Sequence, residues 1–246
     1  MKPPPFEGRL SVVVPVRNEA GNIEPLVTEL ADALAPLSDC EIVYVDDGSD
    51  DGTAAELARM RSRVPGLRIL RHARSCGQSA AIVTGVLAAR FPWIATLDGD
   101  GQNDPSDLRA LLARLAQAQP GDNLQMLVGW RTKRHDTWLR RLSSRVANGV
   151  RARILRDRTP DTGCGLKLFS REAFLRLPSF DHMHRFLPAL IQRGGGRVES
   201  VPVSHRPRTR GTSKYGLFDR LWVGIVDLAG VGWLMARARI PEVIDG

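Results

Sequence analysis

From residue 10 to about residue 130, short apolar segments rich in β-branched residues alternate with amphipathic segments of helical period. The apolar segments predict strands at residues 10–16, 41–45, 67–70, 93–97 and 125–128. The segments between them predict helices at residues 22–34, 53–61, 78–89 and 106–117. Continuous apolar strands separated by helices are typical of a mostly parallel sheet that is covered on both faces. We therefore expect an α/β fold.

The composition is that of a globular protein that works in a reducing compartment. A length of 246 residues allows one large domain or a domain with an appendage, and 43% hydrophobic residues argue against wholesale disorder. The cysteines Cys40, Cys76 and Cys164 are odd in number and far apart, which excludes a disulfide framework and a cysteine zinc site. We expect no export signal and no membrane-spanning segment.

The net charge of +8 is concentrated in one segment. Residues 131–158 contain ten Arg and Lys against Asp136 and Asp157, and the rest of the chain is balanced. A localised basic segment predicts an anionic partner, which could be a nucleic acid, a phosphorylated ligand or an anionic membrane surface. The alternative is an arginine-rich helix that simply faces solvent.

A second amphipathic segment lies near the carboxyl end, at residues 217–235. This segment contains three charged residues, Asp219, Arg220 and Asp227. On a helical projection these three residues and the following Arg237 fall within one arc of 100°. An apolar helix with such a narrow polar stripe can lie in a membrane interface, helped by Trp222 and Trp233. It can also pack against the protein itself.

Acidic and polar residues follow the predicted strands at one edge of the sheet, where ligands bind in open parallel sheets. Asp46 and Asp47 follow the second strand, and Asp98, Asp100 and Gln102 follow the fourth. Carboxylates at such spacing can share one hard divalent ion. Loop aspartates also cap helices, so the Asp98–Asp100 pair alone is a weak signal. Because no glycine-rich dinucleotide or phosphate loop is present, a diphosphate would have to be held by a metal.

Several motifs together resemble glycosyltransferase family 2. They are Val14-Pro-Val-Arg-Asn-Glu19, Val45-Asp-Asp-Gly-Ser49, Gly77-Gln-Ser-Ala-Ala81, Leu97-Asp-Gly-Asp-Gly-Gln-Asn-Asp-Pro105 and Gly129-Trp-Arg131. Three more are similar to the polyprenyl-phosphate branch, which includes the dolichol-phosphate mannosyltransferases: Asp161-Thr-Gly-Cys-Gly-Leu-Lys167, His184-Arg-Phe186 and the segment 205–215. The resemblance covers residues 10–216 in the family's order. It implies a glycosyltransferase domain of GT-A fold over 10–216, preceded by a tail over residues 1–9. The amphipathic pattern and the basic segment described above predict that residues 217–246 are associated with a membrane.

The resemblance also implies ligands and site residues. A UDP- or GDP-sugar donor would be bound by Pro15, Arg17, Glu19, Asp46, Asp47 and Asp98. Mg²⁺ or Mn²⁺ would be held by Asp98, Asp100 and Gln102, and the donor and acceptor phosphates by Arg131, Ser144, Arg208 and Lys214. Arg17 departs from the family, which usually has tyrosine there, although a guanidinium can stack on a base too.

The expected acceptor is a polyprenyl phosphate, which is already ionised at neutral pH and needs cations to position it rather than a general base. We expect Arg131, Arg208 and Lys214 to be catalytic in this sense. Asp161 is the best candidate for a base, and its alternative role is to orient an arginine or cap a turn. His184 is interpreted as structural rather than catalytic.

The expected activity is inverting transfer of a hexose-type sugar by a peripheral enzyme at the cytoplasmic face of the inner membrane, with or without a membrane-protein partner. A second hypothesis is a family member that acts on a saccharide or lipid-saccharide acceptor. A third is a silent protein that binds a nucleotide sugar or nucleic acid. Nucleic acid is disfavoured because the ligand edge of the sheet is acidic.

Overall fold

The computed structural model of the chain describes residues 3–119, 121–132, 149, 151–157, 159–207, 217–237 and 239, and for residues 217–222 only the backbone. Three residues of the predicted phosphate sites, Ser144, Arg208 and Lys214, lie outside the described residues. Most of the basic segment 131–158 lies outside them as well, so its predicted role stays a prediction.

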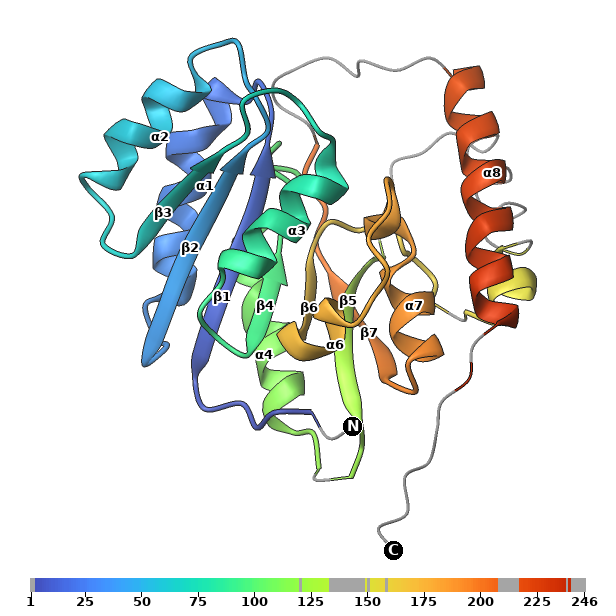
Figure 1. Ribbon diagram of the computed structural model, residues 1–246. Helices are drawn as coiled ribbons and strands as arrows, with labels where there is room; N and C mark the ends of the chain where they lie inside the picture. Colours follow the sequence, from blue (N-terminus) through green and yellow to red (C-terminus); the bar gives the residue numbers. More distant parts are fainter. Residues whose placement is uncertain are drawn as a thin grey trace, which may run out of the picture.

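The described strands form one seven-stranded sheet (Figure 1). The strands are β1 (Arg9–Val16), β2 (Asp39–Asp46), β3 (Leu67–Arg71), β4 (Trp93–Thr96), β5 (Leu124–Arg131), β6 (Lys167–Ser170) and β7 (Arg197–Val203). Their order is β3-β2-β1-β4-β6-β5-β7. Only β6 is antiparallel to its neighbours, β4 and β5. The predicted mostly parallel sheet is therefore confirmed.

Helices cover both faces of this sheet, as predicted. One face carries α1 (Ala20–Leu34), α2 (Thr53–Arg61), the short η1 (Pro105–Asp107) and α4 (Leu108–Ala116). The other carries α3 (Gln78–Ala88), α6 (Arg171–Leu175), η2 (Met183–Arg185), α7 (Leu187–Arg193) and α8 (Leu217–Ala236). Alternate residues of β1 enter the two cores, Val12 and Val14 on the first face and Val13 on the second. This alternation explains why the buried strands are apolar throughout.

Helix α8 packs on the protein through one face and exposes another apolar face. Val231 is fully buried, and His182 Nδ1 lies 2.9 Å from a carboxylate oxygen of Asp227. The exposed face carries Val226 and Trp233, whose exposed fractions are 55% and 61%. One face of the helix therefore packs against the protein, and contact of the exposed face with a membrane stays a prediction. Among the described helices, none combines the length and apolarity needed to cross a bilayer.

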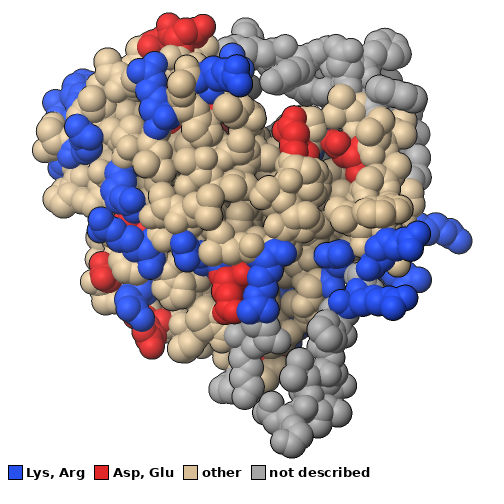
Figure 2. All heavy atoms as spheres, in the orientation of Figure 1, with Lys and Arg blue, Asp and Glu red and all other residues tan. Residues whose placement is uncertain are grey.

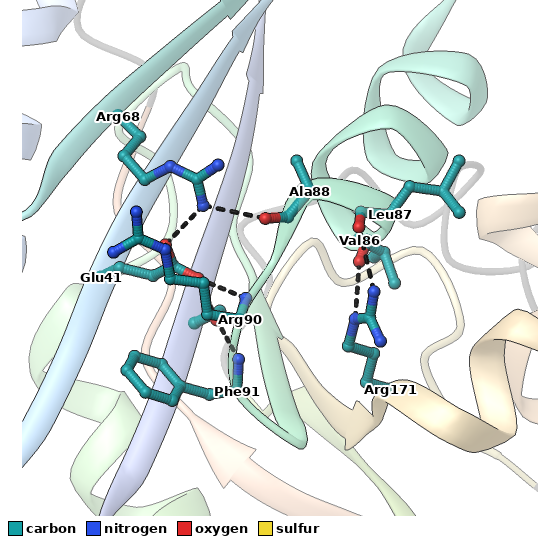
Figure 3. Close-up of polar contacts among 9 residues, drawn as sticks. Glu41, Arg68, Val86, Leu87, Ala88, Arg90, Phe91 and Arg171 are labelled. Carbon is teal, nitrogen blue, oxygen red and sulfur yellow. Dashed lines mark hydrogen bonds and ion pairs between the residues drawn. The ribbon is translucent and has the colours of Figure 1, made fainter.

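A buried glutamate ties the sheet together at the edge where the parallel strands begin (Figure 3). The Glu41 side chain is 3% exposed. It accepts hydrogen bonds from Ser11 Oγ at 2.7 Å, from the Arg90 backbone N–H at 2.6 Å and from Arg68 Nη1 at 2.7 Å. Burial alone would raise the pKa of Glu41, but these hydrogen bonds and the charge of Arg68 lower it below its ordinary value.

The same network closes the carboxyl end of α3. Arg68 also donates to the carbonyl of Ala88 at 2.8 Å, and Arg171 donates to the carbonyls of Val86 and Leu87 at 3.0 Å (Figure 3). Arginine donors at this position satisfy carbonyls that have no partner within the helix. The opposite end of α3, which starts the site described below, is thereby held in place by the sheet.

Glu41→Gln is expected to lower the free energy of unfolding by about 2 kcal/mol at pH 7, because charge-assisted hydrogen bonds to a buried group are lost. A carboxyl group with a lowered pKa stabilises the fold above its unfolded pKa and loses this effect as the pH falls through the folded value. The difference between the variants should therefore shrink in acid. Chemical denaturation at several pH values measures both effects.

The matched control is Glu24→Gln. Glu24 also pairs with two arginines, Arg59 and Arg63, but its side chain is 45% exposed. We expect a change within about 0.5 kcal/mol, which is typical of surface ion pairs. Equal destabilisation of the two variants would contradict the role given to Glu41.

Candidate active site

The loops that follow β1 and β2 are joined by side-chain hydrogen bonds. Asn18 and Asp50 exchange two of them, from Asn18 Nδ2 at 2.6 Å and from the Asp50 backbone N–H at 3.0 Å. The Asn18 backbone N–H also donates to Ser49 Oγ at 3.0 Å. Asn18 has a φ of 57°, a conformation that asparagine tolerates better than most residues. The first two sequence motifs therefore lie side by side at the carboxyl edge of the sheet.

Asp47 holds the loop that leads into α3. Its two oxygens accept hydrogen bonds from His72 Nδ1 and Ser75 Oγ, both at 2.7 Å, and from the backbone N–H groups of Cys76 at 2.8 Å and Gly77 at 2.9 Å. Burial alone would raise the pKa of Asp47, but these hydrogen bonds outweigh burial and lower it below its ordinary value. The structure thus gives this ionised carboxylate a positioning role. Its contact with a nucleotide stays a prediction.

Four other residues predicted to bind the nucleotide lie at or just after the carboxyl ends of β1 and β2. Pro15 is buried and lines the cavity described next, whereas Arg17 is exposed. Glu19 accepts a hydrogen bond from Asn22 Nδ2 at 2.6 Å. Asp46 is fully buried and faces Arg71 Nε at 3.2 Å, so it contributes to the fold of the turn.

A cavity of about 450 Å³ opens at the ends of β1 and β4. Asp98 lies on its wall, and Gln78 at the start of α3 donates a hydrogen bond to Asp98 Oδ1 at 2.8 Å. Burial and the negative charge of Asp100 raise the pKa of Asp98. Asp100 in turn accepts a hydrogen bond from the Gln102 backbone N–H at 3.1 Å. The three predicted metal ligands therefore lie on one short loop.

The donor set fits a hard divalent cation. Burial and the negative charge of Asp100 both raise the pKa of Asp98, and a cation between the two carboxylates would relieve their repulsion. Carboxylate and amide oxygens are the ligands that Mg²⁺ and Mn²⁺ prefer. Metal binding at these residues stays a prediction.

A different group of residues, Asp47, His72 and Cys76, also places three ligand atoms within 4.8 Å of one another. The oxygens of Asp47 are already used by the loop hydrogen bonds described above.

Lys167 brings a positive charge to the same cavity. It is buried in β6, and its ammonium group donates to the carbonyl of Cys164. Burial lowers the pKa of Lys167, and the charge of Asp98 opposes this effect. An ionised Asp98 is thus balanced from within the fold by Lys167.

Arg131 and Asp161 form a buried ion pair beside the cavity. Arg131 Nε and Nη2 donate to the two Asp161 oxygens at 2.7 and 2.9 Å. Burial alone would lower the pKa of Arg131, but the hydrogen bonds and charge of Asp161 raise it above its ordinary value. A two-point pair of this kind fixes the orientation of a guanidinium. The arrangement supports the interpretation that Asp161 orients Arg131, and its role as a base stays a prediction.

His184 also lies on the cavity wall, held by Ser79 of α3. Its Nδ1 lies 2.8 Å from Ser79 Oγ. Burial lowers the pKa of His184 to about 3, helped by the positive charges of Lys167 and Arg185. The ring is therefore neutral at physiological pH. The neighbouring Met183 is buried.

Three residues of this site were not assigned a role from the sequence: Gln78, Lys167 and Arg185. A signal existed for Lys167, because a lysine within the otherwise apolar strand Lys167-Leu-Phe-Ser170 has to be explained by a buried partner. Gln78 and Arg185 stand in two of the motifs quoted above, Gly77-Gln-Ser-Ala-Ala81 and His184-Arg-Phe186, so the resemblance marked their positions without giving them a role.

The chain matches the model of "Glycosyl transferase family 2" over residues 11–177. Glucosyl-3-phosphoglycerate synthase from Mycobacterium tuberculosis, in complex with Mn²⁺ and UDP-glucose, has a similar fold, with a TM-score of 0.62 and 18% identity over 95% of this chain and 81% of the other. Mannosyl-3-phosphoglycerate synthase from Rubrobacter xylanophilus gives a TM-score of 0.66 at 16% identity, over 96% of this chain and 77% of the other. At these identities the likeness concerns the fold alone.

Curated relatives are more similar in sequence. The dodecaprenyl-phosphate galacturonate synthase of Rhizobium johnstonii is 37% identical over 94% of this chain and 69% of its own length. The undecaprenyl-phosphate 4-deoxy-4-formamido-L-arabinose transferase of Edwardsiella ictaluri is 34% identical over 85% of this chain and 63% of its own length. The chain thus spans about two thirds of these relatives. The resemblance inferred from the motifs is confirmed, and the chain belongs to glycosyltransferase family 2, with polyprenyl-phosphate sugar transferases among its relatives.

Proposed function

We propose that this chain is an inverting, metal-dependent glycosyltransferase that moves a hexose-type sugar from a UDP- or GDP-sugar to a polyprenyl phosphate. The observation that supports a phosphate as the sugar acceptor concerns which cavity residues could serve as a general base. A hydroxyl acceptor needs a general base, whereas a phosphate acceptor does not. Three described cavity residues could accept a proton, and none suits this role. Asp98 would be taken up by the metal, Asp161 is held by Arg131 in an ion pair, and His184 has a pKa of about 3.

The described residues would share the work as follows. Asp98, Asp100 and Gln102 would hold Mg²⁺ or Mn²⁺, which acts as a Lewis acid that neutralises a leaving diphosphate. Gln78 orients Asp98, and Lys167 balances its charge. Arg131, fixed by Asp161, would position a phosphate where negative charge develops, with Ser144, Arg208 and Lys214 completing this set.

The names of the relatives support this proposal. Both curated relatives are named for sugar transfer involving a polyprenyl phosphate, of dodecaprenyl or undecaprenyl type. The Mycobacterium tuberculosis structure holds Mn²⁺ together with UDP-glucose, which supports a divalent ion and a nucleotide-sugar donor in this fold.

The test is mass spectrometry of a short polyprenyl phosphate incubated with the purified protein, Mn²⁺ or Mg²⁺ and a panel of UDP- and GDP-sugars. We expect a lipid product heavier by one sugar residue. If no lipid product forms while a donor still binds with metal, the proposal is replaced by a saccharide or lipid-saccharide acceptor. If no donor binds, the chain is not an active transferase.

The outer face of α8 supports peripheral attachment to an anionic membrane. This face exposes Val223, Ile225, Val226 and Trp233. Figure 2 shows basic side chains gathered on the side of the molecule where α7 and the carboxyl end of α8 lie, and Arg237 directly follows the helix. Apolar residues with adjacent arginines are typical of interfacial helices. We place the enzyme at the cytoplasmic face of the inner membrane.

Replacing Val226 and Trp233 together by glutamate is expected to lower binding to phosphatidylglycerol-containing vesicles by at least about 10-fold, because apolar surface and charge attraction are both lost. Vesicle co-sedimentation measures this binding. The control is Leu87→Glu on α3, where the side chain is 60% exposed and far along the chain from α8. Equal binding of both variants would exclude α8 as the contact surface.

A further inference from the structure

Three residues beside the candidate active site offer metal ligands of a different kind from the Asp98–Asp100 pair. They are Asp47 after β2, His72 after β3 and Cys76 in the loop before α3. One ligand atom of each lies within 4.8 Å of the other two. His72 and Cys76 stand outside the family motifs quoted above, so a role for these two side chains is not part of the resemblance.

The His72 ring is held with its Nδ1 atom toward Asp47. This Nδ1 lies 2.7 Å from Asp47 Oδ1, and the Nε2 atom on the other side of the ring lies 2.9 Å from Thr84 Oγ1 on α3. A histidine that binds a metal through one nitrogen usually donates its other N–H to a nearby oxygen, which fixes the ring. Thr84 is placed to accept that hydrogen bond, so the ring is already oriented for a metal at Nδ1.

Cys76 provides the third ligand and a route from solvent. The residue is exposed, and its thiol donates to the carbonyl of Arg74 at 3.4 Å. The Cys76 backbone N–H donates to Asp47 Oδ1 at 2.8 Å, which keeps this residue beside the carboxylate. The wide spacing of the cysteines excludes a zinc site built from several of them, but this site needs only one.

We propose that Asp47, His72 and Cys76 bind Zn²⁺. Thiolate, imidazole and carboxylate together are a ligand set typical of zinc, whereas Mg²⁺ prefers oxygen ligands alone. On binding, the Cys76 thiol releases its proton to solvent, and His72 binds as a neutral ring with its proton on Nε2. The thiolate and the carboxylate then balance the two charges of the ion, and water takes the fourth position.

The site needs only a small rearrangement. Ligand atoms around a tetrahedral zinc ion lie about 3.5 Å apart, so His72 Nδ1 would move away from Asp47 Oδ1 by less than about 1 Å. The ion would replace the hydrogen bond between these two atoms. The hydrogen bonds that Asp47 accepts from Ser75, Cys76 and Gly77 can remain.

Zinc at this site is expected to inhibit the enzyme. Asp47 is among the residues proposed to bind the nucleotide, and an ion on this carboxylate would compete with the donor. This part of the inference rests on the proposed function, whereas metal binding itself does not.

The first experiment uses Co²⁺ in place of Zn²⁺, because a bond from Co²⁺ to a thiolate gives a charge-transfer absorption that oxygen ligands do not give. The full chain is titrated with Co²⁺ in excess Mg²⁺, which occupies sites made of oxygen ligands such as the Asp98–Asp100 pair. We expect one equivalent of Co²⁺ to produce the thiolate band and excess Zn²⁺ to remove it.

Variants assign the band to its ligands. Cys76→Ser should abolish the band, and His72→Gln should weaken Co²⁺ binding by at least about 10-fold. The matched control is Cys40→Ser, at a half-buried thiol on β2, which should keep the band. No band in the wild type, or a band that survives in Cys76→Ser, would overturn the site. The unfolding transition without metal checks that Cys76→Ser is folded.

The second experiment measures calorimetric binding of the preferred UDP- or GDP-sugar in Mn²⁺, with and without equimolar Zn²⁺. Zinc should lower donor affinity by at least about 10-fold in the wild type and by less than about 3-fold in Cys76→Ser, each relative to the same protein without zinc. Equal inhibition of both proteins would place the zinc effect elsewhere and overturn the inhibitory role. If no donor binds even without zinc, the proposed function fails, and the Co²⁺ titration still decides the metal site.

Discussion

Asp98→Asn and Asp100→Asn are each expected to lower sugar transfer by at least about 1000-fold, because each removes a charged ligand from the site that would hold the diphosphate. Nucleotide-sugar binding should lose its dependence on Mn²⁺ in both variants. Turnover of polyprenyl phosphate by mass spectrometry measures the first effect, and calorimetric titration with and without Mn²⁺ measures the second.

The fold should remain intact in these variants. Since burial and Asp100 raise the pKa of Asp98, its ionised form is disfavoured in the folded chain, and this cost grows as the pH rises through the unfolded value. Asparagine removes that cost, so Asp98→Asn should not lower the free energy of unfolding at pH 7. Lost activity with an unchanged unfolding transition would therefore identify a functional defect.

Asp104→Asn is the matched control on the same loop. Asp104 accepts a hydrogen bond from the Ser106 backbone N–H at 2.9 Å at the start of η1, which is the capping role that loop aspartates often have. Asparagine caps about as well, so transfer should stay within about 3-fold of the wild type. If Asp100→Asn kept Mn²⁺-dependent binding, the assignment of the metal ligands would be wrong.

Local sequence patterns predicted most of the sheet, because buried parallel strands must be apolar on both faces. The predicted helix at residues 53–61 coincides with α2, and the predicted strand at 10–16 lies within β1. The position of β6 could not be predicted in this way. Its antiparallel insertion between β4 and β5 depends on contacts between strands that are far apart in sequence.

In the candidate site, too, local sequence patterns predicted some residues, whereas others depend on contacts between distant parts of the chain. Asp98 and Asp100 were predicted because a strand end fixes their place in the fold. The role of Asp47 could not be seen from its motif, since its partners at residues 72–77 follow a different strand. The contact of His184 with Ser79 joins residues 105 positions apart, which explains why a histidine interpreted as structural lies on the cavity wall.

The second large effect is expected from a glycine. Gly165→Ala should lower transfer by at least about 100-fold, because misplacing a catalytic group by about 1 Å has effects of this size. A Cβ atom at Gly165 would lie 2.2 Å from Asp98 Oδ2 and 2.7 Å from Asn103 Oδ1. Thr96 Oγ1 donates to the Gly165 carbonyl at 3.0 Å, which holds this backbone against β4. The added methyl group must therefore displace Asp98.

The expected defect of Gly165→Ala is a displaced Asp98 in a chain that still folds, and two measurements distinguish it from unfolding. Overpacking next to a movable side chain should lower the free energy of unfolding by about 1 to 3 kcal/mol, while Mn²⁺-dependent donor binding is largely lost. Gly52→Ala is the control, because its Cβ would meet only the Ala20 side chain at an ordinary 3.5 Å. Full transfer by Gly165→Ala would contradict this prediction. It would mean that the position of Asp98 next to Gly165 is not required for catalysis.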